Sequence, residues 1–181
     1  QNYVVEKQCD IGIATDGDAD RIGVIDDKGN FLHPNDILVL LYYYLVKFKG
    51  WHGPMVRNIA TTHMLDKVAE QFGEKCYEVP VGFKYVSAKM QETGAIIGGE
   101  SSGGLTVHGH INGKDGIYAA ALLIESMLFA VVALSKLVLY IDCFGFTPKR
   151  LQSTWLVCVL LFGSACALYT HLTGKKSMRV W

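Results

Sequence analysis

The stretch MVRNIATTHMLDKVAEQFGEKCYEVPVGFKYVSAKMQETGAIIGGE, residues 55–100, decides the fold of this chain. Three short apolar runs alternate in it with two helical patterns, which end at Gly73 and Gly94. This alternation is typical of βαβ units and predicts a mainly parallel sheet. In such sheets ligands bind beyond the carboxyl ends of the strands, so we expect the functional residues there.

The flanking segments add further elements. A short buried strand is expected over 11–14, followed by a polar loop and a β-hairpin with Gly29 in its turn. A well-buried helix is expected over 34–50. A strand over 105–109 and a helix that begins near Asp115 complete the pattern. We therefore predict an α/β fold, with a mainly parallel mixed sheet and flanking helices, followed by an apolar helical tail.

The composition gives no net charge, because 17 Lys and Arg residues balance 17 Asp and Glu residues, so we expect no nucleic-acid partner. The five cysteines are odd in number and have no Cys-x-x-Cys spacing, which argues against a disulfide framework or a zinc site. We expect reduced thiols and a cytoplasmic location for the α/β part. The first residues, from Gln1, include no initiator methionine or signal peptide, and we expect a fragment of a longer protein.

Three aspartates, Asp16, Asp18 and Asp20, alternate with small residues, and Arg21 follows them. Carboxylates this close repel one another unless a cation compensates, and Mg²⁺ prefers oxygen ligands, so we predict that the three side chains converge on Mg²⁺. Arg21 cannot ligate a cation, but its guanidinium suits a phosphate oxygen beside the metal. The alternative is a solvated acidic turn. A calcium EF-hand loop is rejected, because it needs glycine where Arg21 stands.

The glycine-rich stretch GGESSGG, residues 98–104, surrounds Glu100 and two serines. Glycines permit close backbone approach, and a carboxylate beside hydroxyl groups suits the hydroxyls of a sugar. Lys84 stands at the expected start of a helix, where its ammonium and the backbone N–H groups could meet an anion. The simpler alternatives are a flexible loop and a surface lysine.

Four pieces occur together and in order: TDGDADR (15–21), VGFKY (81–85), GGESSGG (98–104) and GKDGIYAA (113–120). The set resembles the α-D-phosphohexomutase family, the phosphoglucomutases and phosphomannomutases. The resemblance runs from about Tyr3 to Glu125. The aspartate piece is highly specific for that family, the glycine piece is moderately specific, and the other two are supportive.

The resemblance implies an enzyme that interconverts hexose 1-phosphate and hexose 6-phosphate through a phosphoserine, with Mg²⁺ as cofactor. In that family four domains surround one cleft; the second carries the Mg²⁺ loop and the third a sugar-binding loop. Residues 1–33 would then end the second domain, and residues 34–125 would form the third. The implied roles are Mg²⁺ binding by Asp16, Asp18 and Asp20, phosphate-side support by Arg21, contacts to sugar hydroxyls by Glu100 and Ser102, and a place in the substrate site for Lys84.

The sequence also departs from the family. It contains no stretch of the SxSHNP type, so no serine inherits the role of the nucleophile, and it contains no Ser-Gly-Thr-like phosphate loop. We therefore expect a fragment of a mutase that is inactive alone. The alternative is a non-catalytic module that binds Mg²⁺ and a sugar phosphate at a membrane.

Residues 126–181 form the apolar tail. The stretch 122–141 is long enough to span a bilayer but contains Glu125 and Lys136, whereas 154–172 has no charged residue. Buried core helices are the alternative to membrane spans. Because soluble phosphohexomutases have no such tail, we expect either a membrane-tethered module or, preferably, a junction of unrelated coding segments near 125–128.

Overall fold

The computed structural model describes residues 1–143, with side chains through Ser135. Its first part is a three-stranded antiparallel sheet preceded by a short helix that the sequence analysis did not anticipate. These elements are α1 (Asn2–Glu6), β1 (Ile11–Thr15), β2 (Ile22–Asp26) and β3 (Phe31–Leu32). The hairpin between β2 and β3 is confirmed: Oδ1 of Asp26 accepts hydrogen bonds from the N–H groups of Lys28 and Asn30, and Gly29 has a φ of 84°.

The second sheet has the order β5-β4-β6-β7. Its strands are β4 (Met55–Asn58), β5 (Cys76–Val79), β6 (Ile97–Gly99) and β7 (Leu105–Val107). The pairs β4–β5 and β4–β6 are parallel and β6–β7 is antiparallel, so the predicted mixed, mainly parallel sheet is confirmed. All four residues of β4 are buried, as expected for the central strand of a sheet covered on both faces.

Three helices cover this sheet: α2 (Pro34–Lys47), α3 (Met64–Gln71) and α4 (Phe83–Thr93). The helix α4 ends where predicted, at Gly94 in the left-handed conformation. The helix α3 begins without a side-chain hydrogen bond from its N-cap residue. Its N-cap position is His63, and Thr62 contributes by accepting a hydrogen bond from the N–H of Met64 at 3.2 Å.

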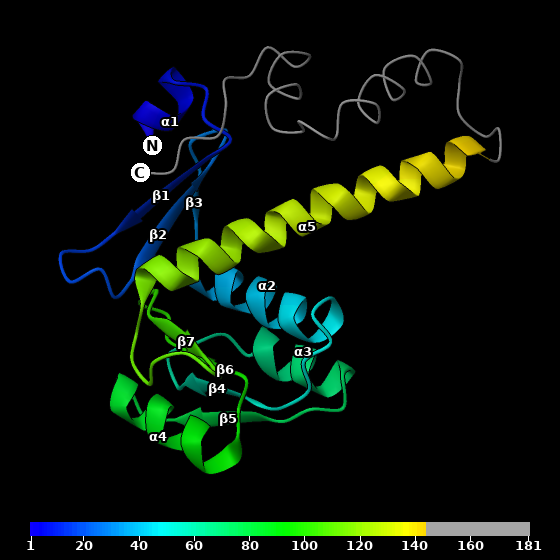
Figure 1. Ribbon diagram of the computed structural model, residues 1–181. Helices are drawn as coiled ribbons and strands as arrows, with labels where there is room; N and C mark the ends of the chain where they lie inside the picture. The colour runs from blue at the N-terminus through cyan, green and yellow to red at the C-terminus, as the bar shows by residue number, and fades with distance from the viewer. Residues whose placement is uncertain (144–181) are drawn as a thin grey trace.

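The core is divided by the second sheet. On one face, Val56, Val79, Val86, Met90 and Ala95 pack between the sheet and α4. On the other face, side chains of α2 and α3 join residues of both sheets in a larger cluster. Figure 1 shows α4 on one side of β4–β7, and α2 and α3 on the other. The helix α2 contributes much of the larger cluster, since Leu38, Leu41, Tyr42 and Leu45 are almost fully buried.

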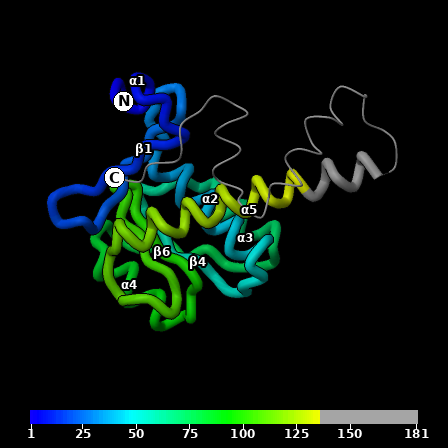
Figure 2. Tube along the Cα trace, turned by 45° about the horizontal axis from the view of Figure 1, so that its top comes forward, coloured from blue at the N-terminus to red at the C-terminus, as the bar shows by residue number. Residues whose placement is uncertain are grey.

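The last described element, α5 (Gly116–Cys143), is one continuous helix of 28 residues. Its first half packs on α2 and the first sheet, with an ion pair of 3.0 Å between Lys49 and Glu125. It then passes through residues 125–128, the predicted junction, without a break and extends away from the α/β core (Figures 1 and 2). Among the described residues it is the one helix long and apolar enough to cross a membrane. The candidate span at 154–172 lies outside the described residues.

Candidate functional site

The aspartate loop, residues 16–21, connects β1 to β2 and folds around Asp16. Oδ1 of Asp16 accepts hydrogen bonds from the N–H groups of Asp20 (3.2 Å) and Arg21 (3.3 Å). Ala19 has a left-handed φ of 57°, and its N–H donates to the carbonyl of Asp16 at 3.1 Å. The backbone therefore curls tightly, but it does so through hydrogen bonds within the loop.

Cationic side chains, and not a cluster of carboxylates, organise the charge of this loop. Among residues 1–135, whose side chains the structure describes, no three Asp, Glu, His or Cys side chains gather closely enough to hold a metal ion. Nε of Arg21 lies 3.5 Å from a carboxylate oxygen of Asp16 and 3.5 Å from one of Asp20. Nζ of Lys114 lies 2.6 Å from Oδ2 of Asp20. The hydrogen bond from Lys114 holds the pKa of Asp20 below its usual range.

The loop nevertheless offers oxygen atoms that suit Mg²⁺. Oδ1 of Asp20 is buried and accepts no hydrogen bond from the part of the chain that the structure describes. The side chain of Asp18 is exposed. A buried, unpartnered carboxylate oxygen is the kind of atom that a hard divalent cation satisfies. The donor set therefore fits the cation in its chemistry, while the role of Asp16, Asp18 and Asp20 as ligands stays a prediction.

The glycine loop, residues 98–104, closes a tight turn between β6 and β7. The N–H of Glu100 donates to the carbonyl of Gly104 at 2.9 Å, and the N–H of Gly103 donates back to the carbonyl of Glu100 at 3.1 Å. Gly103 has a φ of 94°, and a Cβ placed there would lie 2.7 Å from the carbonyl oxygen of Ile22. Glycine is needed at 103 because the backbone of β2 runs directly against the loop.

Backbone contacts fasten the glycine loop to the aspartate loop. The N–H of Ile22 donates to the carbonyl of Gly103 at 3.3 Å, and Arg21 forms an antiparallel bridge with Gly104. From the start of α5, the N–H of Gly116 donates to the carbonyl of Ala19 at 2.9 Å. The two motifs, far apart in the sequence, thus lie side by side.

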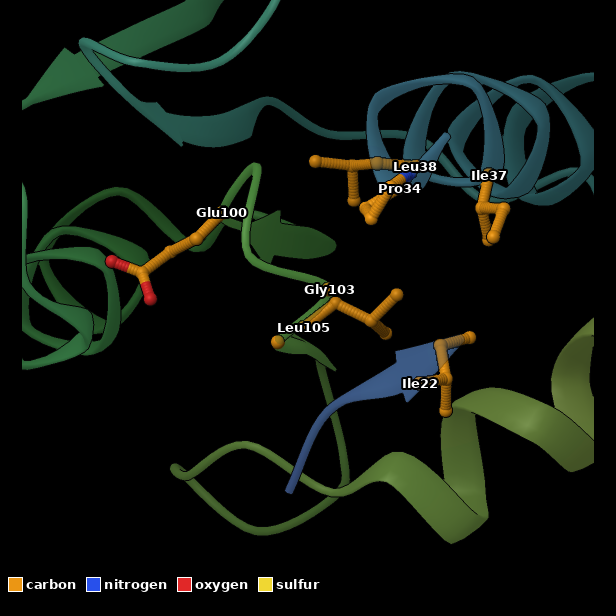
Figure 3. A pocket seen from close by; sticks show the side chains of 8 residues that line it. Ile22, Pro34, Ile37, Leu38, Glu100, Gly103 and Leu105 are labelled. Carbon is orange, nitrogen blue, oxygen red and sulfur yellow. The ribbon is translucent and has the colours of Figure 1, made fainter. Parts of the chain in front are cut away.

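Glu100 is held rigidly at the centre of this arrangement, and its side chain is buried. Its Oε1 accepts hydrogen bonds from Nδ2 of Asn58 and from the N–H of Gly82, each at 3.1 Å. Oγ of Ser102 lies 3.5 Å from Oε2. Because Gly82 is the N-cap of α4, the carboxylate faces the positive end of that helix. Figure 3 shows it turned away from the labelled apolar side chains of α2 and β2.

The start of α4 forms the third side of the site. Lys84 lies in its first turn with an exposed side chain, and its Nζ is 4.8 Å from the ring centroid of Tyr85. Nζ of Lys114 lies 6.0 Å from the ring centroid of Phe83, so Lys114 bridges the start of α4 and Asp20. The sequence-predicted residues of the aspartate loop, the glycine loop and α4 are therefore brought to one region.

Two residues of this region were assigned no role from the sequence, Asn58 and Lys114. Asn58 is the last residue of β4, and a polar residue at the carboxyl end of a central parallel strand is a usable signal. Lys114 follows the glycine loop within the GKDGIYAA piece, but its ion pair with Asp20 depends on the path of a loop that no local pattern reveals.

The comparison with protein families agrees with this geometry. Residues 33–141 match the model of phosphoglucomutase/phosphomannomutase, alpha/beta/alpha domain III. The chain belongs to the phosphoglucomutase/phosphomannomutase family. The match to this family begins one residue before Pro34 and continues past Glu125 to residue 141. It therefore includes part of the segment that the sequence analysis assigned to the tail.

Individual relatives carry names from the same family. The chain is 32% identical over 166 residues to a phosphoglucosamine mutase of Solidesulfovibrio magneticus, covering 91% of this chain and 36% of that protein. It is 37% identical over 136 residues to a phosphoglucosamine mutase of Carboxydothermus hydrogenoformans, covering 74% and 30%. A crystal structure of a protein assigned as a phosphomannomutase, from Thermus thermophilus, superposes with a TM-score of 0.66 at 37% identity, covering 69% of this chain and 29% of that one. The chain thus spans about a third of the length of the curated relatives it matches.

Proposed function

We propose that this chain forms the metal-binding and sugar-binding side of a phosphohexomutase site. In this proposal Asp16, Asp18 and Asp20 hold Mg²⁺, and Arg21 supports the phosphate beside it. Glu100 and Ser102 bind sugar hydroxyls, and Lys84 lines the substrate site. The observation that carries the proposal is the direct backbone attachment of the aspartate loop to the glycine loop, through Ile22–Gly103 and Arg21–Gly104.

Each side chain has a defined task in this site. Glu100 is already oriented by hydrogen bonds from Asn58 and Gly82. Its carboxylate can therefore accept further hydrogen bonds from a ligand without losing side-chain entropy on binding. The exposed ammonium of Lys84 lies in the first turn of α4, where N–H groups and the helix dipole favour anions. Bound Mg²⁺ would supply electrostatic compensation for charge on the transferring phosphoryl group.

We further propose that the 181 residues alone do not turn over substrate. The sequence offers no serine in a phosphoserine-type loop, and Ser101 and Ser102 stand in the sugar loop. The proposed organisation is 1–33 as the end of the metal-loop domain, 34–125 as the sugar-binding domain and 126–181 as the apolar tail. A complete reaction would then require a serine and a second phosphate site from outside these residues.

The proposed substrate class is the hexose phosphates. The relatives are named for phosphoglucosamine and phosphomannose, which share the phosphate and most ring hydroxyls. Glucose 1-phosphate, mannose 1-phosphate and glucosamine 6-phosphate therefore make a suitable panel of ligands.

The test is calorimetric titration of the chain with Mg²⁺ and then with each sugar phosphate. Asp18→Asn should weaken Mg²⁺ binding, and Glu100→Gln should weaken sugar phosphate binding at saturating Mg²⁺. Glu92→Gln is the matched control, because Glu92 is exposed on α4 and pairs with Lys89. Equal affinities in the wild type and both site variants would contradict the proposed function. Mutase turnover that is lost in Asp18→Asn would contradict the proposed inactivity.

A specific observation favours a second, additional role as a membrane-tethered module. The segment Gly116–Ser135 has a mean hydropathy of 2.3, and only 22% of it is buried. The exposed apolar side chains of its second half include Leu128, Val131, Val132 and Leu134. Every residue from 128 to 134 is exposed, and at 100° per residue this run covers all sides of the helix, which a lipid bilayer could satisfy at once.

A further inference from the structure

The side chain of Lys114 is fixed between three elements of the proposed site. Its Nζ contacts Oδ2 of Asp20 at 2.6 Å and lies 6.0 Å from the ring centroid of Phe83. Its aliphatic stem lies so close to Gly104 that a side chain at 104 would overlap it. Only 18% of the Lys114 side chain is exposed. This ammonium is therefore held in place, unlike a typical surface lysine.

The backbone sets the distance between Lys114 and Asp20. Two residues after Lys114, the N–H of Gly116 donates to the carbonyl of Ala19 at 2.9 Å. A Cβ at 116 would lie 2.8 Å from the oxygen of Ala19 and 2.9 Å from that of Arg21, so the two segments are in direct contact. The backbone of Lys114 is therefore held beside the aspartate loop, while its ammonium can still move through rotation of the side chain.

The two carboxylate oxygens of Asp20 have different surroundings. Oδ2 has Lys114 as a partner, whereas Oδ1 is buried and accepts no hydrogen bond from the side chains and backbone that the structure describes. Arg21 approaches Oδ1 to 3.5 Å, which is an ion pair without a hydrogen bond. The ammonium of Lys114 already pairs with this carboxylate. A divalent ion would therefore have to share the carboxylate with the ammonium or displace the ammonium.

We propose that Lys114 is a built-in competing cation, which occupies Asp20 when no divalent ion is bound and thereby lowers the affinity of the aspartate loop for Mg²⁺. A divalent ion brings two charges near the carboxylate and repels the ammonium, so its binding loosens the Lys114–Asp20 pair. The inference rests on the proposed role of the aspartate loop in Mg²⁺ binding. It adds a residue that tunes this binding from outside the ligand set.

The first experiment measures Mg²⁺ and Mn²⁺ affinity of the full chain by calorimetry and by the electron paramagnetic resonance signal of free Mn²⁺. Lys114→Met and Lys114→Gln should bind about fivefold more tightly, the size expected from loss of a competing ion pair at a partly exposed carboxylate. Lys114→Arg keeps the charge and should bind no more tightly than the wild type. Lys89→Met, which removes a charge on α4 outside the site, should change the affinity less than twofold, on the order of error.

The outcomes separate the two proposals. If Asp18→Asn binds the cations as tightly as the wild type, the proposed metal site fails. If Asp18→Asn weakens binding but Lys114→Met and Lys114→Gln match the wild type or bind more weakly, only the competition fails. Equal gains in Lys89→Met and Lys114→Met would also overturn it, because they would show a general effect of charge. The glutamine variant keeps a polar side chain of similar length, so it still tests the proposal if the methionine variant does not fold.

The second experiment follows the ammonium itself. Trace acetylation, quantified by mass spectrometry, should modify Lys114 faster when Mg²⁺ is added to the wild type, because the ion loosens the pair with Asp20. Lys89 is the matched control: its Nζ pairs with Glu92 at 2.7 Å and its side chain is 28% exposed, but it lies on α4 outside the site. An acetylation rate at Lys114 that is unchanged by saturating Mg²⁺ would overturn the proposal.

Discussion

Nδ2 of Asn58 donates a hydrogen bond of 3.1 Å to Oε1 of Glu100. Both side chains are buried, and they connect the end of β4 to the glycine loop after β6. Oδ1 of the same asparagine accepts hydrogen bonds from Oγ1 of Thr61 at 2.6 Å and from the N–H of Ala60 at 3.1 Å. Asn58 therefore holds Glu100 against a loop that is itself fixed, which makes it a positioning residue of the proposed site.

The first prediction is that Asn58→Ala lowers the free energy of unfolding by about 1–3 kcal/mol, because a buried carboxylate loses a donor and Thr61 loses its acceptor. It should also weaken the binding of glucose 1-phosphate at saturating Mg²⁺. Urea denaturation and calorimetry measure the two effects. Asn112→Ala, at an exposed position, is the control and should be neutral. Wild-type stability in Asn58→Ala would contradict the role given to this hydrogen bond.

The second prediction concerns the contact between Gly103 and Ile22. Gly103→Ala meets both an unfavourable φ of 94° and the backbone oxygen of Ile22, whereas Gly109→Ala has a φ of 84° and open space around it. Strain alone should cost Gly109→Ala about 1–2 kcal/mol. Gly103→Ala should lose clearly more, and its Mg²⁺ affinity should change because the aspartate loop must shift. Equal losses in thermal denaturation would show that the close approach of β2 does not matter.

Much of this fold follows from local patterns. The order of strands and helices over residues 55–107, the hairpin around Gly29 and the stop at Gly94 come from periodicity and turn chemistry, and the structure confirms them. The helix α1 was not anticipated, because five residues show too little periodicity to stand out. The three aspartate side chains do not gather in the structure, because Asp16 accepts hydrogen bonds from the backbone of its own loop and Asp20 pairs with Lys114. Such long-range pairings depend on tertiary packing that a sequence window does not contain.

The third prediction concerns Arg57, which was given no role from the sequence and whose side chain is only 3% exposed. Its Nη2 lies 2.9 Å from Asp66 and its Nη1 lies 2.8 Å from Glu78. Arg57→Met should lower the free energy of unfolding by about 1–3 kcal/mol, less than for a fully buried pair, because both carboxylates can regain water. In the Arg57→Met background, Asp66→Asn should have little further effect. Additive losses in urea denaturation would contradict the pairing.

The fourth prediction is a loss of stability in acid. The N–H of Tyr118 and then the ring of His110 donate to Asp115, and these hydrogen bonds hold the pKa of Asp115 below its usual range. Asn30 has the same effect on the pKa of Asp26. Since the unfolded chain binds these protons more readily, the stabilisation is present above pH ~3.9 and is lost as the pH falls below it. Urea midpoints across this range should fall for the wild type and fall less for Asp115→Asn, which keeps a capping oxygen. Identical slopes would contradict the assignment.

The last prediction concerns the second half of α5, where aromatic and basic residues mark the point at which the helix leaves the core. The ring centroids of Phe129 and Phe48 are 5.0 Å apart, and those of Phe129 and Tyr44 are 5.9 Å apart. The neighbouring segment KFKGW, residues 47–51, carries two lysines and a tryptophan. Aromatic rings and lysines are typical of the boundary between a bilayer and water. We therefore expect this end of α2 to lie at a membrane surface with the rest of α5 inserted.

A protein of residues 1–143 isolates this effect from the remainder of the tail. It should float with vesicles of phosphatidylcholine and phosphatidylglycerol in a density gradient, because Val131 and Leu134 expose 54% and 59% of their surface on one face of the helix. Val131→Asp combined with Leu134→Asp should leave it at the bottom of the gradient, since each buried carboxylate would cost about 2–3 kcal/mol in the bilayer. Asp substitutions at the exposed Ala88 and Gln91 of α4 are the matched control and should still float. If the 1–143 protein is monodisperse and does not bind the vesicles, the apolar surface of α5 is covered by something other than lipid, and the membrane role is wrong.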